Sequence, residues 1–103
     1  MEGVESFVAE CFWPGVSGTD LEALDRRVEA ATAQLLEQQR SIRYLGSLLM
    51  REDEVVLCQF EGDADAVREA VERARVPFER ILDTGHSPWP ANDDGAGEKE
   101  GRP

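Results

Sequence analysis

Five polar residues interrupt apolar runs at spacings that place them on one face of a β-sheet. Glu10 is the one charged residue in the run SFVAECFW, residues 6–13. A carboxylate in an apolar, enclosed pocket has a raised pKa and can act as a general base. Glu10 is therefore the candidate catalytic base, and the other members of this candidate pocket are Arg43, Ser47, Gln59 and Glu61.

These residues have a second interpretation that involves no catalysis. Arg43 and Glu61 then form an ion pair at the rim of the sheet, and Glu10 and Gln59 form hydrogen bonds across a dimer interface. The sequence leaves two functions open. One is a non-catalytic protein that binds a metal or a small molecule, and the other is a cofactor-independent enzyme of the isomerase, cyclase or monooxygenase type. No motif for an organic cofactor or a phosphate-binding glycine loop is evident.

The stretch 42–61, IRYLGSLLMREDEVVLCQFE, predicts an antiparallel hairpin. A three-residue loop, Arg51-Glu52-Asp53, fixes its register. In that register Met50 lies opposite Glu54, Leu48 opposite Val56, Gly46 opposite Cys58, Tyr44 opposite Phe60 and Arg43 opposite Glu61. We then expect Leu48, Val56, Cys58 and Phe60 in the core, and Leu45, Ser47, Leu57, Gln59 and Glu61 on the other face.

The remaining elements follow from periodicity and from stop signals. A first strand covers 6–13 and ends at Pro14-Gly15. A helix over 20–38 begins at a capping box formed by Thr19 and Glu22. A second helix begins at Asp63 and ends before Pro77, and a last strand covers 78–84.

The order strand, helix, strand, strand, helix, strand predicts a ferredoxin-like α+β sandwich. Its four-stranded antiparallel sheet has two helices on one face and leaves the other face open. Because an apolar face needs a cover, we expect a homodimer that forms an α+β barrel through the sheet faces. The predicted organisation is a lead-in over 1–5, a domain over 6–84, and an acidic, Gly/Pro-rich disordered tail over 85–103 that carries His86 and Trp89.

Charge and composition exclude some partners. The formal net charge is −11, with 22 acidic and 11 basic residues, so we expect neither nucleic acid nor a membrane as partner. The sequence lacks both a long apolar span and a basic signal-peptide start, which predicts a cytoplasmic protein. Cys11 and Cys58 lie in apolar strands without metal-binding spacing and are expected to be buried free thiols.

Several segments carry a family resemblance: FVAECFWPG, the hairpin ending in Cys-x-aromatic-Glu, the DADAVREA helix start and the Pro-aromatic-x-x-Ile entry to the last strand. Over about residues 7–83 the chain resembles small bacterial proteins of unknown function that are often described as nickel-binding. The resemblance implies a ferredoxin-like fold, a dimer and a divalent metal. Imidazole suits nickel, yet this chain has a single histidine, His86. The candidate metal ligands are Glu10, Glu61 and His86.

Overall fold

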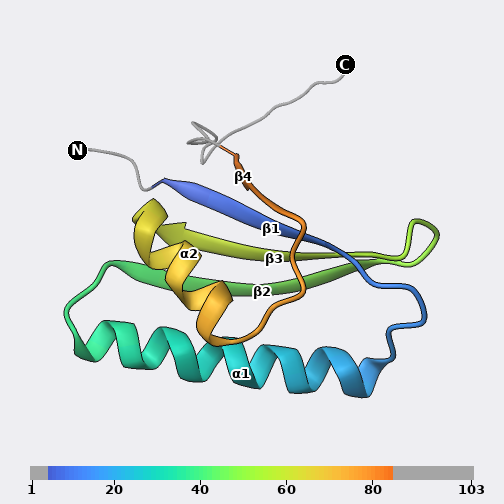
Figure 1. Cartoon of the computed structure of the whole chain (residues 1–103), viewed down its shortest axis with the longest axis horizontal. Coiled ribbons are helices and arrows are strands. Elements are labelled where there is room, and N and C mark those ends of the chain that lie inside the picture. The colour runs from blue at the N-terminus through green and yellow to red at the C-terminus, as the bar shows by residue number, and fades with distance from the viewer. Residues whose placement is uncertain (1–4, 85–103) are drawn as a thin grey trace, which may run out of the picture.

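Two helices pack on one face of a four-stranded antiparallel sheet in the computed structural model, which describes residues 5–84 (Figure 1). The elements are β1 (Ser6–Phe12), α1 (Gly18–Glu37), β2 (Ile42–Met50), β3 (Val55–Gly62), α2 (Ala64–Arg73) and β4 (Arg80–Asp83). The strand order is β2-β3-β1-β4. The predicted ferredoxin-like fold is therefore confirmed. The predicted tail, with His86 and Trp89, lies outside the described residues.

The core lies between the helices and one face of the sheet. The apolar stripe of α1 is buried as its periodicity predicts, and so is that of α2. The fully buried large side chains are Phe60, Leu24, Leu35, Val28, Val56, Val67, Val71, Cys11 and Cys58. Both cysteines are free and buried, as predicted. Within the described part, neither helix is long and apolar enough to cross a membrane.

The first helix begins earlier than its predicted capping box. Ser17, and not Thr19, is the N-cap: its hydroxyl accepts from the Asp20 amide at 3.0 Å, and the Asp20 carboxylate accepts from the Ser17 amide at 2.9 Å. Both sequence pairs fit the capping-box pattern. The earlier box adds a further helical bond, from the Leu21 amide to the Ser17 carbonyl at 3.1 Å.

The hairpin register differs from the prediction between its loop and Gly46. The loop has four residues, 51–54, so Met50 pairs with Val55 rather than with Glu54. A β-bulge at Leu45 absorbs the extra residue, because Tyr44 pairs with Phe60 whereas Gly46 pairs with Gln59. Gly46 has φ +112°, which glycine adopts readily. Consequently Leu48 pairs with Leu57, and the predicted pairs of Tyr44 and Arg43 are retained.

The last strand is shorter than predicted. The Phe78 amide donates to the Val76 carbonyl at 2.8 Å, which keeps the chain in a turn after Pro77. The Glu79 amide then donates to the Glu10 carbonyl at 2.8 Å and starts the pairing of β4 with β1. This pairing places Arg80 directly opposite Glu10, a position that the sequence pattern left ambiguous.

Candidate functional site

The sheet face that points away from the helices is the candidate site. Among residues 5–84 no element covers this open face (Figure 1). Phe12, Leu48 and Met50 are 53%, 51% and 40% exposed. They lie in cross-strand rows with partly buried Val55 and Leu57. Exposed apolar surfaces of this kind are typical of interaction sites.

An ion pair between Glu10 and Arg80 lies on this apolar face. The Arg80 Nε donates to the Glu10 Oε1 at 2.6 Å, across the directly opposed positions of β1 and β4. This hydrogen bond raises the pKa of Arg80 above its ordinary value. Glu10 is therefore on the open face as predicted, but its carboxylate is engaged by a guanidinium.

Gln59 is an unpartnered polar side chain of the open face. It lies half-buried on β3, between Val8 of β1 and Gly46 of β2 in one cross-strand row. Within residues 5–84 its amide makes no side-chain hydrogen bond. A Cβ at Gly46 would meet nothing within 4 Å, so space is open beside Gln59. The amide is thus available to a molecule that covers the sheet.

Ser47 does not belong to the predicted pocket. The bulge at Leu45 reverses the alternation of side chains, and Ser47 pairs with Cys58, whose side chain is buried under the helices. Leu48 takes the corresponding position on the open face, although it was predicted to lie in the core. The signal that could have revealed the exchange is Gly46, because a glycine inside a strand pattern often marks a bulge.

The predicted metal ligands do not come together within one chain. Arg43 and Glu61 form the predicted cross-strand ion pair at 3.7 Å. Glu10 and Glu61 lie opposite Leu57 and Ser6 respectively, four positions apart along the sheet, or about 13 Å. His86 lies outside the described residues. No group of three or more His, Cys, Asp and Glu side chains in the described range gathers at a point where a metal could bind.

A second set of reactive groups lies on the helix side of the sheet. The Tyr44 hydroxyl donates to the Asp25 Oδ1 of α1 at 2.5 Å, and burial together with this bond raises the pKa of Tyr44. A hydrogen bond with Cys58, together with burial, raises the pKa of the Cys11 thiol. Both cysteine side chains are 0% exposed. These groups stabilise the core and present no nucleophile to solvent.

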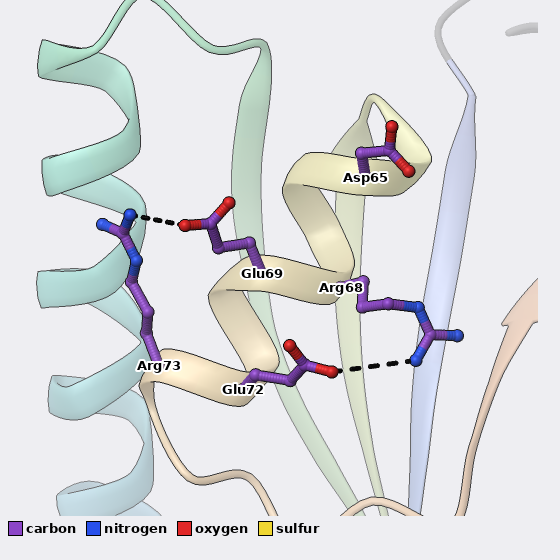
Figure 2. A pocket seen from close by; sticks show the side chains of 5 residues that line it. All are labelled: Asp65, Arg68, Glu69, Glu72 and Arg73. Atoms are coloured by element: carbon purple, nitrogen blue, oxygen red, sulfur yellow. Dashed lines mark hydrogen bonds and ion pairs between the residues drawn. The ribbon is translucent and has the colours of Figure 1, made fainter.

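A shallow hollow on the outer surface of α2 is lined entirely by charged side chains (Figure 2). Its volume is about 450 Å³. Arg73 pairs with Glu69 at 2.5 Å, and Arg68 pairs with Glu72 at 4.0 Å, each along the helix. Because these charges neutralise one another in solvent, the hollow has the character of a solvated helix face rather than a binding site.

Comparison with known proteins supports the fold and leaves the function open. No protein-family model matches the chain, and no curated protein matches it. Among solved structures the chain is similar to the crystal structure of SCO4226 from Streptomyces coelicolor A3(2). The TM-score is 0.62 and the sequence identity is 19%, over 80% of this chain and 98% of the other. At this identity the likeness shows a shared fold.

Proposed function

We propose that this chain is a small cytoplasmic homodimeric binding protein, in which two open sheet faces pack together and hold a ligand between them. The observation that carries the proposal is the uncovered apolar face, with Phe12, Leu48 and Met50 between 40% and 53% exposed. A second copy is the occupant that fits, because an isologous interface matches apolar rows with apolar rows. The acidic surface and the two free thiols favour a cytoplasmic location.

The size of the face supports this occupant. Strands of seven to nine residues in β1, β2 and β3 give a face about 25 Å long, and four strands at about 4.8 Å spacing give a width of about 17 Å. Because protruding side chains add area to the flat outline, two such faces bury on the order of 1,200 Å² in total. This area is at the lower end of the range for specific interfaces.

The charged groups Glu10 and Arg80 are paired, which lowers the cost of covering them without removing it. Because the two groups lie 2.6 Å apart, covering them leaves no uncompensated charge. Gln59 remains with a free amide beside the space at Gly46. An apolar enclosure with a few polar groups, here Gln59 and the Glu10–Arg80 pair, is typical of a site for a small molecule. The ligand site is then completed by both copies.

Nickel binding stays a prediction of the family resemblance. The described residues of one chain do not supply three converging ligands. The test is to treat the purified protein with a chelator, measure its metal content and titrate nickel by calorimetry. Saturable heat at a fixed stoichiometry would support a metal site, and heat no greater than that of dilution would exclude one.

The enzymatic alternative, with Glu10 as general base, also stays a prediction. Arg80 engages the Glu10 Oε1, so Oε2 would have to accept the proton from a substrate. No observation in the described residues favours this step. The Glu10→Gln variant tests it once a substrate is known, since unchanged turnover would remove Glu10 as the base.

The experiment that tests the dimer is sedimentation equilibrium of the full chain. The expected mass is twice that of the 11.4 kDa chain, with a dissociation constant in the micromolar range or tighter. Native mass spectrometry of the same sample then reports a small molecule retained by the dimer. A mass of one chain at the highest attainable concentration would overturn the proposal.

A further inference from the structure

A narrow crevice lies between two loops at the end of the sheet where the hairpin turns. Trp13, Gly15 and Val16 of the β1–α1 connection line one side. Leu49 and the hairpin residues Arg51 and Glu54 line the other side. The volume of the crevice is about 120 Å³. Since Trp13 and Leu49 pack against the core under the helices, the crevice is distinct from the open face.

Glu54 is held in position by the segment that forms the opposite wall. Its backbone has a left-handed φ of +55°. The Glu54 carbonyl accepts from the Trp13 amide at 2.8 Å, and its Oε2 accepts from the Gly15 amide at 3.4 Å. The other carboxylate oxygen, Oε1, makes no hydrogen bond within residues 5–84. The Glu54 carboxylate thus lines the crevice beside the Gly15 amide and has acceptor capacity to spare.

Arg51, which also lines the crevice, supplies the opposite charge. In the described part of the chain no carboxylate lies within ion-pair distance of its guanidinium, and this includes Glu54. The crevice therefore carries one available cation and one available anion above walls formed by Trp13, Val16 and Leu49. This arrangement is complementary to a zwitterion with an apolar body. A guanidinium binds a carboxylate in a planar fork, and a carboxylate binds an ammonium group.

We propose that this crevice binds a free α-amino acid with a small aliphatic side chain. Arg51 binds the ligand carboxylate, Glu54 binds its ammonium group, and the side chain lies against Trp13 and Leu49. The volume fits the side chain of such a ligand and not the whole molecule: at about 30 Å³ for each water-sized group, the crevice accommodates about four such groups. Three- or four-carbon branched side chains, as in valine and leucine, match this number.

The test is a titration of the full chain with small-molecule probes, in which tryptophan fluorescence is the readout. The chain has two tryptophans, so the Trp89→Phe background leaves Trp13 as the reporter. The probes are L-valine, isovalerate, which lacks the ammonium group, and isobutylamine, which lacks the carboxylate. We expect a saturable change with L-valine and affinities at least about tenfold weaker for the two analogues. Equal binding of either analogue, or no response to L-valine, would overturn the proposal.

Two variants test the assigned roles. Arg51→Gln and Glu54→Gln should each weaken L-valine binding by about tenfold or more. Arg26→Gln, at an exposed position of α1 away from the crevice, is the matched control and should leave binding unchanged. Circular dichroism establishes that each variant is folded. Unchanged affinity in both crevice variants would refute the site. The outcome does not depend on dimerisation, because every lining residue comes from one chain.

Discussion

Replacing Leu48 by lysine should dissociate the proposed dimer. Leu48 is 51% exposed in the single chain and lies in the row formed with Leu57 and Glu10. Full burial of a leucine contributes roughly 1.5–3 kcal/mol, so covering the exposed half contributes about 1 kcal/mol per copy. A lysine forfeits this contribution and adds the cost of removing an ammonium group from water, at least about 1 kcal/mol per copy. Over two copies the loss is about 4 kcal/mol, or about a thousandfold in Kd.

The assay is sedimentation equilibrium of wild type and variant at several concentrations. Leu36→Lys is the matched control, because Leu36 is 54% exposed but lies on α1, away from the open face. The control changes the net charge equally and should leave the dimer Kd within about threefold of the wild-type value. The reasoning is refuted if Leu48→Lys dimerises as tightly as wild type, or if Leu36→Lys weakens the dimer equally.

Three further predictions concern the fold that presents the site. Gly62→Ala should destabilise the domain by about 4 kcal/mol in chemical denaturation, because the new Cβ would lie 2.3 Å from the Ser41 carbonyl oxygen at a φ of +135°. An unchanged denaturation midpoint would contradict this. Tyr44→Phe removes the hydroxyl that donates to Asp25 and should cost about 1–2 kcal/mol in the same assay, whereas a neutral effect would show that the bond contributes nothing. Hydrogen bonds from two arginines lower the pKa of Glu69, so its contribution to stability is present above its ordinary pKa of 4.5 and is lost as the pH falls through the lowered value. The difference in Tm between wild type and Glu69→Gln should therefore shrink below about pH 4.5, and a constant difference would be evidence against this linkage.

The fold was predictable because the hydrophobic pattern and the element order agree. Alternation in β1 places Glu10 on the face opposite the helices, and the opposite-charge pair of Arg43 and Glu61 follows from the hairpin pattern. Both signals are local or depend on one cross-strand pairing. The predicted pairing of Arg43 with Glu61 stays correct although the loop length was wrong, because the bulge restores the predicted register beyond Leu45.

The loop itself was not predictable from the hairpin alone. The Trp13 amide donates to the Glu54 carbonyl, and this long-range contact holds Glu54 in a left-handed conformation outside the strand. Sequence rules for hairpins do not include a contact with a distant strand. The resulting one-residue shift exchanged Ser47 and Leu48 between the two faces, which is the main error in the predicted site.

The partner of Glu10 was missed for a related reason. In the last strand apolar residues fall on the same face as Arg80, and Ile81 falls on the other face, so alternation alone does not assign a face to Arg80. The pairing of β4 with β1 decides it, because Glu10 and Arg80 are directly opposed. A search for opposite charges on strands that the fold makes neighbours would have identified this pair.

The most direct test of the central claim is a nuclear Overhauser experiment on a dimer of one isotope-labelled and one unlabelled copy, filtered for contacts between the two. The account predicts intermolecular contacts among the side chains of Phe12, Leu48 and Leu57. It predicts none that involve Leu36 of α1. Intermolecular contacts confined to the helices, or their absence from the open face in a sample of twice the chain mass, would contradict it.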